Sequence, residues 1–489
     1  MAHCTGEGIA RHTIIQGGMG IGVSNWKLAR AVAQEGQIGV VSGTALGSVL
    51  ARRLQDGDHD GSLRRALRHC PLPFAAEAIL RRYWIPNGRA AGRPYQLPPL
   101  PALDSPRELT ALTIVANFVE VFLAKEGHSG VVGLNLLEKL QLPTMPSLFG
   151  AMLAGVDCVL MGAGIPSAIP GALDRLARWE PAELRIAVDG VPASESPVIT
   201  FDPAEFVSPP RPALTRPAFL AIVSSSALAT MLTRKASGRV DGFVIEGHTA
   251  GGHNAPPRGP ARDASRDRPV YGPRDTTDLA AIRALGLPFW LAGSYAHPDK
   301  LAAARAEGAA GVQIGTAFAY CDESGLDPVL KHAVLRRSQD QTLTVVTDGS
   351  ASPTGMPFKV VAVETTLSED DVYRQRTRKC DLGYLRQPYR KSDGSVGYRC
   401  PAEPEADYVR KGGAIEDTVG RKCLCNGLIS AIGLANPVGI DRVEPALLTA
   451  GEDVVHLHRF LPAGRFSYSA ADVLHALLDE PVPAKTGAQ

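Results

Sequence analysis

The sequence lacks a long apolar run, an excess of one charge and any pair of cysteines at the Cys-x2-Cys spacing. Its apolar runs fall short of the roughly 20 residues that cross a bilayer, so we expect no membrane association. A formal net charge of +1 gives no overall field that would recruit nucleic acid. Residues 1–11 lack a cationic stretch followed by an apolar run, which predicts no signal peptide and a cytoplasmic protein. Neither nucleic acid nor a membrane is therefore expected as a partner, and homo-oligomer formation stays open.

What the chain does contain is a regular alternation of two periodicities over its first 337 residues. Short apolar runs are each followed by a stretch rich in Ala, Leu and Arg with helical spacing, which is typical of βα units on a parallel sheet. We expect helices over 26–35 and 227–235, and strands over 12–15, 38–41, 133–137, 158–161, 219–223, 242–245, 289–292 and 311–314. Eight such strands predict an α/β protein with a (β/α)8 TIM barrel.

Three parts of the chain interrupt or end this alternation. The barrel is expected over residues 1–340, with inserted lobes near 51–106 and 181–217, the second holding short strands over 186–188 and 198–200. A long loop is expected over 254–274, following a strand, where barrel enzymes build their sites. Residues 341–489 are expected to form a C-terminal extension that contains a cluster of cysteines.

The stretch from Gly242 to Asn254 reads as a buried strand that runs into a glycine-rich turn and then a histidine, His253. Glycines let a backbone approach a bound ring closely, and a histidine can exchange a proton near neutral pH. Other polar or small residues also fall at predicted strand ends, which a barrel gathers at one mouth. Asn135 and Glu246 could contact the edge of a heterocycle, and Met19 could pack on its face. The candidate cofactor-binding residues are Gly17, Gly18, Met19, Asn135, Glu246, Ala250, Gly251, Gly252, Gly293, Ser294, Gln313, Gly315 and Thr316.

Four motifs in this order resemble the nitronate monooxygenase family, formerly called 2-nitropropane dioxygenases. They are Ile14 to Gly20, Gly133 to Leu136, Glu246 to His253 (Glu-Gly-His-Thr-Ala-Gly-Gly-His) and Gly311 to Phe318 (Gly-Val-Gln-Ile-Gly-Thr-Ala-Phe), and the resemblance covers about residues 12–360. It implies a TIM barrel that binds FMN without a covalent link and oxidises alkyl nitronates with O2. It also implies that His253 takes the catalytic position and that Gln313 to Thr316 hold the FMN phosphate.

The chain departs from this family at Gly18, where many members have proline, and at Ser224 to Ser226, where some place a basic residue. Related barrels with the same histidine reduce enoyl thioesters or quinones with NAD(P)H, so a flavin reductase is the main alternative. A third interpretation is a partner-binding component of a biosynthetic assembly. His248 is a second candidate for catalysis, although a solvent-facing turn residue is the simpler interpretation of it.

Four of the eight cysteines, Cys380, Cys400, Cys423 and Cys425, are close in sequence. Four thiolates can bind structural zinc or an iron–sulfur cluster, and a segment rich in Gly, Pro and charge would gain stability from such a ligand. Because the usual spacing is absent, unligated thiols, zinc and an iron–sulfur cluster all stay open.

Overall fold

The structure is a computed structural model, and it describes residues 6–259, 262–263, 268–438 and 442–478. The prediction of no signal peptide concerns residues 1–11, of which the first five lie outside this range.

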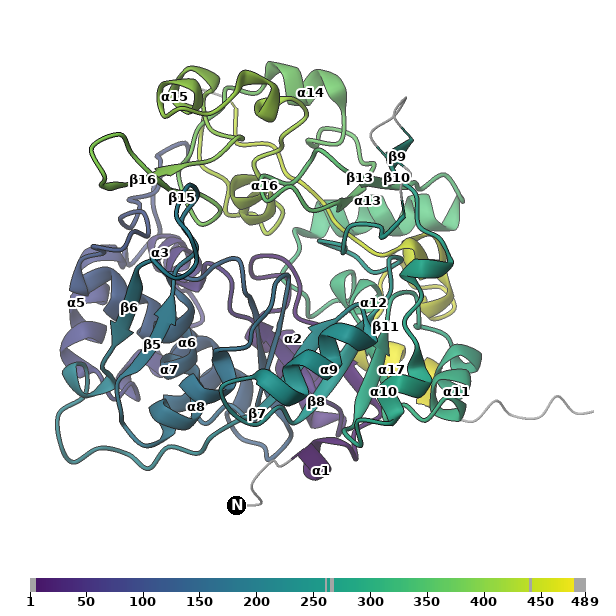
Figure 1. Ribbon diagram of the computed structural model, residues 1–489. Coiled ribbons are helices and arrows are strands. Elements are labelled where there is room, and N and C mark those ends of the chain that lie inside the picture. Colours follow the sequence, from purple (N-terminus) through teal and green to yellow (C-terminus); the bar gives the residue numbers. More distant parts are fainter. Residues whose placement is uncertain (1–5, 260–261, 264–267, 439–441, 479–489) are drawn as a thin grey trace, which may run out of the picture.

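At the centre is a parallel sheet in the order β1-β12-β11-β8-β7-β4-β3-β2 (Figure 1). Its strands are β1 (Ile14–Gln16), β2 (Gly39–Ser42), β3 (Val132–Leu137), β4 (Cys158–Gly162), β7 (Ala218–Val223), β8 (Gly242–Glu246), β11 (Phe289–Ala292) and β12 (Gly311–Ile314).

The sheet closes on itself between its first and last strands. Ile15 forms a parallel bridge with Ile38, immediately before β2, and the Gln16 N–H donates to the Ile38 carbonyl at 2.9 Å. All neighbouring strands pair in parallel, so their carboxyl ends point the same way. The predicted (β/α)8 barrel is therefore confirmed, with each predicted strand within two residues of its observed bounds.

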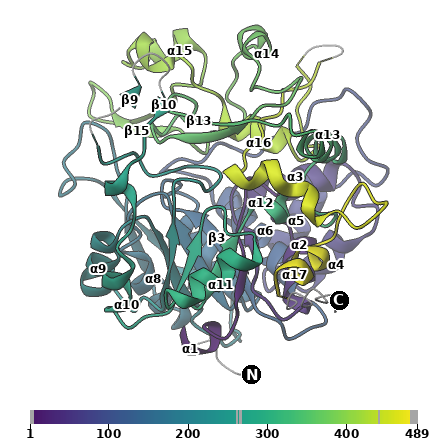
Figure 2. The same ribbon diagram turned by 90° about the vertical axis from the view of Figure 1, so that its right-hand side faces the viewer.

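Helices surround the barrel because each has one apolar face to bury. Asn25 caps α2 by accepting from the Leu28 N–H at 2.9 Å. The outer helices are α2 (Trp26–Gln34), α3 (Leu46–Gln55), α6 (Arg107–Lys125), α7 (Thr144–Leu153), α8 (Ile169–Ala177), α9 (Ser226–Lys235), α10 (Leu279–Arg283), α11 (Pro298–Ala306), α12 (Thr316–Ala319), α13 (Pro328–Gln339) and α17 (Ala470–Leu478). Helix α17, at the end of the described chain, packs against both α2 and α11 (Figure 2).

The barrel interior is packed with side chains at the amino ends of the strands. Ile15, Val40, Leu160, Val244 and Trp290 are buried in one cluster, which the short helix α1 (Gly6–Ile9) joins through its last residue. In Figure 1, α1 lies at the lower end of the barrel. Burial of these apolar groups stabilises the barrel and leaves its opposite end for a site.

The two expected insertions hold regular structure. The first contains α4 (Ser62–Arg68) and α5 (Pro73–Tyr83). The second contains an antiparallel hairpin of β5 (Ala182–Arg185) and β6 (Val198–Phe201), followed by η1 (Pro203–Glu205). The predicted strand over 186–188 was therefore wrong in position, because the pairing residues precede it. The loop after β8 contains β9 (Arg262–Asp263), β10 (Arg268–Pro269) and η2 (Pro273–Asp275).

Residues 341–478, which we call the C-terminal segment, run over the carboxyl ends of the barrel strands before returning to its side (Figures 1 and 2). Two antiparallel hairpins, β13–β14 and β15–β16, alternate with short helices. The elements are β13 (Val345–Asp348), β14 (Phe358–Val361), α14 (Asp370–Gln375), β15 (Gln387–Arg390), β16 (Val396–Arg399), α15 (Glu405–Arg410), η3 (Ile415–Thr418), α16 (Leu424–Ser430) and η4 (Glu452–Phe460), before α17.

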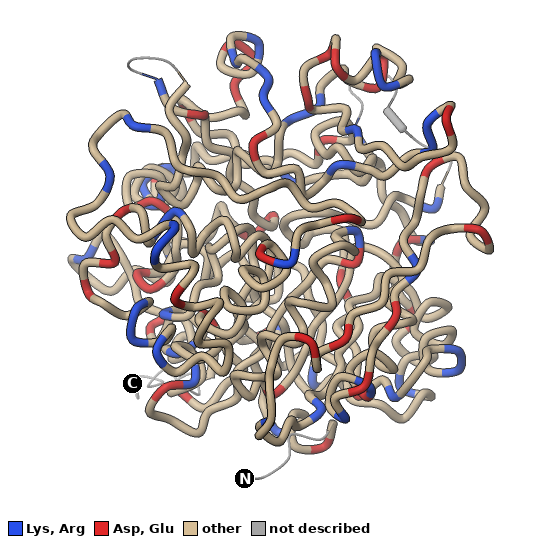
Figure 3. The backbone as a smooth tube through the Cα atoms, turned by 90° about the vertical axis from the view of Figure 1, so that its left-hand side faces the viewer, with Lys and Arg blue, Asp and Glu red and all other residues tan. Residues whose placement is uncertain are grey.

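The exterior carries both signs of charge. Figure 3 shows basic and acidic residues interspersed on the face it presents, as the net charge of +1 indicates. Within the described residues, no helix combines the length and apolar character that a membrane span requires.

Candidate functional site

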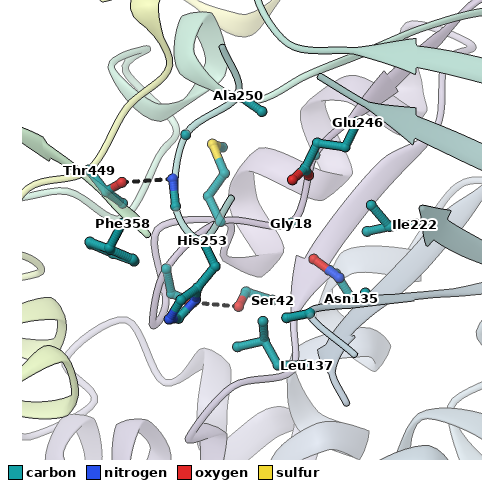
Figure 4. Close-up of a pocket in the computed structure, with 18 of the residues that line it drawn as sticks. Gly18, Ser42, Asn135, Leu137, Ile222, Glu246, Ala250, His253, Phe358 and Thr449 are labelled. Carbon is teal, nitrogen blue, oxygen red and sulfur yellow. Dashed lines mark hydrogen bonds between the residues drawn. The ribbon is translucent and has the colours of Figure 1, made fainter. Parts of the chain in front are cut away.

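A cavity of about 410 Å³ lies between the carboxyl ends of the barrel strands and the C-terminal segment (Figure 4). Its lining includes every residue predicted as catalytic or cofactor-binding. The barrel gathers them from the ends of five strands, β1, β3, β8, β11 and β12, because its strands are parallel and the sheet is closed. They are Gly17, Gly18, Met19, Asn135, Glu246, Ala250, Gly251, Gly252, His253, Gly293, Ser294, Gln313, Gly315 and Thr316.

Two of these glycines allow close approaches that a side chain would prevent. A Cβ at Gly18 would lie 2.2 Å from the Cβ of Asn135. The loop after β1 can therefore pack this closely against β3 only because residue 18 has no side chain. A Cβ at Gly251 would lie 2.7 Å from the carbonyl carbon of Ala450, in the C-terminal segment. Gly18, where many family members carry proline, thus has a packing reason of its own.

The loop after β8 is held on two sides by the C-terminal segment. The Gly252 N–H donates to the Thr449 hydroxyl at 2.8 Å, a bond drawn in Figure 4. The Lys359 N–H donates to the Gly252 carbonyl, and the Asn254 N–H donates to the Pro357 carbonyl, both at 2.9 Å. This is the antiparallel bridge that joins His253 to Phe358. The position of His253 is therefore fixed by residues about a hundred positions further along the chain.

His253 itself lies against Phe358, with the ring centroids 4.9 Å apart and nearly perpendicular. Its Nε2 is 2.7 Å from the hydroxyl of Ser352, and its Nδ1 has no hydrogen-bond partner among the described residues. Burial lowers the pKa of His253 to about 4, because an imidazolium would lose hydration there. At neutral pH the ring is thus uncharged, with one nitrogen able to accept a proton.

Glu246 ends β8 on the same side of the cavity as Asn135 and Ile222 (Figure 4). Its carboxyl has no hydrogen-bond partner among the described residues, and burial raises the pKa of Glu246 to about 8. A carboxyl that is protonated at neutral pH can donate a hydrogen bond as well as accept one. The Asn135 amide N–H donates to the carbonyls of Leu160 and Leu136, at 3.2 and 3.3 Å.

Near the ends of β11 and β12, two polar atoms of the lining are buried without a partner in the described structure. They are Gln313 Oε1, on β12, and the Ser294 hydroxyl, after β11. A buried polar atom that lacks a partner costs free energy, so such atoms usually mark a place where a ligand binds. Together with the glycine-lined approaches, they fit a flat heterocycle with a polar edge and a phosphate near β11 and β12.

Sequence reasoning missed Asp453. It is the second residue of η4 and lines the cavity, as Thr316 does. Its Oδ1 is buried without a partner in the described structure, and burial raises the pKa of Asp453. The Thr316 hydroxyl accepts from the Gly451 N–H at 2.9 Å, which brings the start of η4 to the end of β12. A carboxyl here lies beside the position predicted for a phosphate, and no local pattern around residue 453 indicated it.

The apolar wall opposite the barrel was also missed. It comes entirely from the C-terminal segment, whose residues were not predicted to reach the site. Its members are Met356, Phe358, Tyr384, Leu385, Leu424, Cys425, Leu428, Leu447 and Leu448. Apolar side chains scattered over this length have no shared periodicity, so no signal in the sequence would have assigned them to a cavity.

The predicted metal site is not supported. Cys380, Cys400, Cys423 and Cys425 do line one small cavity of about 10 Å³. Among the residues that the structure describes, however, no group of three or more His, Cys, Asp and Glu side chains is arranged to hold a metal ion. Without a ligand, burial raises the pKa of all four thiols, that of Cys423 to about 11.

His248 lies outside the cavity lining, and of the three serines after β7 the lining includes Ser224. His248 is exposed and stacks on Tyr271, with the ring centroids 4.6 Å apart, as the simpler interpretation predicts. Ser225 caps α9 by accepting from the Leu228 N–H at 3.2 Å. The Ser224 carbonyl accepts from Arg258, so a basic side chain from the loop after β8 lies where this chain lacks one after β7.

Comparison with known proteins adds a sequence relationship to this geometry. The sequence model of the family described as nitronate monooxygenase matches residues 184–372. A probable nitronate monooxygenase from Staphylococcus saprophyticus is 34% identical over 113 residues, which are 23% of this chain and 30% of that protein. A (3aS,4S,5R,7aS)-5-hydroxy-7a-methyl-1-oxo-octahydro-1H-indene-4-carboxyl-CoA dehydrogenase from Rhodococcus jostii is 32% identical over 143 residues, 29% of this chain and 34% of that protein.

The matched region thus spans about a third of the length of each of these relatives. Among solved structures, a nitroalkane oxidase from Streptomyces ansochromogenes aligns over 95% of both chains, with 16% identity and a TM-score of 0.43. The family match includes the strand ends of β8, β11 and β12, and with them His253, Ser294 and Gln313. The resemblance to the nitronate monooxygenase family is therefore confirmed, and the relationship rests on residues 184–372 of this chain.

Proposed function

We propose that this protein is an FMN-dependent oxidoreductase of the nitronate monooxygenase type, which oxidises alkyl nitronates with O2. The observation that carries the proposal is the cavity at the carboxyl ends of the barrel strands, where an uncharged histidine faces glycine-lined loops and unpartnered polar atoms. Bound FMN would supply the redox chemistry, and the chain would supply binding, orientation and proton transfer.

Each residue has a role in this proposal. His253 binds a nitronate, or takes the proton from the carbon next to a nitro group, through its free Nδ1. Glu246, Asn135 and Gln313 hold the polar edge of the ring, while Met19 packs on its face. Gly293, Ser294, Gly315 and Thr316 hold the phosphate with backbone N–H groups and hydroxyls, in the place that TIM barrels commonly use.

The test begins with an absorption spectrum of the purified protein, which should have the bands of oxidised flavin. His253→Asn should keep bound FMN but lose about 100-fold or more in kcat with ethyl nitronate, the range for a lost acid–base group. His248→Asn is the matched control, since that ring is exposed and outside the cavity lining. A colourless protein, or near-normal turnover in His253→Asn, would contradict the proposal.

A second candidate is an NAD(P)H-dependent flavin reductase of enoyl thioesters. It is favoured by the apolar wall from the C-terminal segment, including Leu385, Leu424 and Leu428, which offers more apolar contact than a small nitronate needs. One relative is also named as acting on a CoA thioester. Anaerobic mixing separates the two candidates: rapid bleaching of the flavin by NADPH supports the reductase, and bleaching by a nitronate alone supports the oxidase.

A further inference from the structure

A chain of hydrogen bonds leads from His253 away from the cavity. Ser352, whose side chain is fully buried, lies 2.7 Å from Nε2 and 2.8 Å from the hydroxyl of Thr354. Thr354 is only partly buried, and the next residue, Gly355, is exposed. The two hydroxyls therefore lead from Nε2 of the imidazole toward an exposed residue of the C-terminal segment.

The chain is held in place by backbone contacts. The Thr354 N–H donates to the Ser352 hydroxyl at 3.2 Å, so the loop folds over this side chain. Arg421 donates to the carbonyls of Ser350 and Ser352, at 2.8 and 2.7 Å. These bonds fix the loop that carries both hydroxyls relative to His253.

The tautomer of His253 decides the direction of these bonds. If Nε2 carries the proton, it donates to Ser352, Ser352 donates to Thr354, and only an acceptor lone pair on Nδ1 faces the cavity. In the opposite direction an Nδ1–H would face the cavity with no acceptor among the described residues. Only the first arrangement leaves Nδ1 able to accept a proton from a ligand, so it is the arrangement in which the ring can act as a base.

We propose that Ser352 and Thr354 form a proton relay that connects His253 with solvent. When Nδ1 takes a proton from a ligand carbon, the Nε2 proton passes to Ser352, the Ser352 proton to Thr354 and the Thr354 proton to water. One proton enters and one leaves, so all three side chains end uncharged, and the reverse sequence restores them. Ser352 also acts as a positioning residue, because its acceptor keeps the Nδ1 lone pair toward the cavity.

The role of His253 as base belongs to the proposed function, so the main test does not depend on turnover. In protein labelled with 15N-histidine, the His253 resonances are assigned by their loss in His253→Asn. Nitrogen shifts should show the Nε2–H form in the wild type and a mixture of both forms in Ser352→Ala. Exchange of the Nε2 proton with water should slow at least about tenfold in Thr354→Val and recover in Thr354→Ser.

Thr342→Val is the control, because Thr342 is exposed on the chain before β13 and its hydroxyl has no partner in the described structure. Unchanged exchange in Thr354→Val, or an Nδ1–H form in the wild type, overturns the relay even if the protein oxidises nitronates. If no nitronate is oxidised but the expected exchange pattern is found, the relay stands and the proposed function fails. In an active enzyme, Thr354→Val should lower kcat with little change in KM, and Thr354→Ser should restore it.

Discussion

The barrel mouth and the C-terminal segment contribute different chemistry to one cavity. Strand ends of the barrel supply glycines and polar groups, such as Asn135, Glu246 and Gln313. The C-terminal segment supplies apolar side chains, the hydroxyl of Ser352 and the backbone groups that hold the loop of His253. The barrel thus presents the polar half of the cavity, while the orientation of His253 depends on residues that are remote in sequence.

The largest expected effect comes from a substitution where the loop after β8 packs tightly against the C-terminal segment, at Gly251 and Ala450. In Gly251→Ala the new methyl would meet the Ala450 backbone at 2.7 Å, and backbone cannot rotate away as a side chain can. We expect a loss of about 1–3 kcal/mol in the free energy of unfolding, with turnover reduced further because His253 moves. Urea titration and steady-state kinetics measure the two effects. Gly259→Ala, where the methyl would meet nothing within 4 Å, should match the wild type.

The second prediction concerns Glu246, which belongs to the barrel half. Because burial raises its pKa to about 8, unfolding releases a proton at every pH between the unfolded value near 4.5 and about 8. Stability should therefore fall as pH rises through this window, by at most about 1.4 kcal/mol per unit and less where water enters the cavity. Above pH 8 this contribution is constant.

Glu246→Gln should remove that slope, and the surface variant Glu195→Gln should keep it. The measurement is the free energy of unfolding from urea titrations at several pH values between 5 and 9. Equal slopes in wild type and Glu246→Gln would mean that the carboxyl is already ionised in the folded protein.

The sequence was sufficient for the barrel half because each strand end carries a local signature. An apolar run such as 242–245 followed by small residues places Glu246 and His253 at the mouth without knowledge of their neighbours. The hydrogen bond from His253 to Ser352 spans 99 residues, and nothing near Ser352 distinguishes it from other serines in turns. For the four cysteines, closeness in sequence left unligated thiols, zinc and an iron–sulfur cluster all open, and no group of three or more potential metal ligands is found among the described residues.

The third prediction tests whether the C-terminal half selects the substrate. Leu428→Trp would fill space in the apolar wall and leave the strand ends of the barrel unchanged. We expect kcat/KM to fall about tenfold for nitronates with long alkyl chains, a cost near 1.4 kcal/mol, and to stay near wild type for ethyl nitronate. Val419→Trp, on the exposed surface, is the control. Equal losses for short and long substrates would place the alkyl chain elsewhere.

The smallest expected effect lies where the two halves meet, at Asp453 and Thr316. Burial raises the pKa of Asp453, yet its unpartnered Oδ1 faces the region where a phosphate is proposed, and two anionic groups there would repel. Asp453→Asn keeps the shape and removes the charge, so the dissociation constant of FMN should fall about fivefold, or about 1 kcal/mol. Fluorescence titration of the flavin-free protein measures this, with the exposed Asp299→Asn as control. Unchanged or weaker binding in Asp453→Asn would contradict this prediction, because it would mean that the carboxyl places no repelling charge near the phosphate.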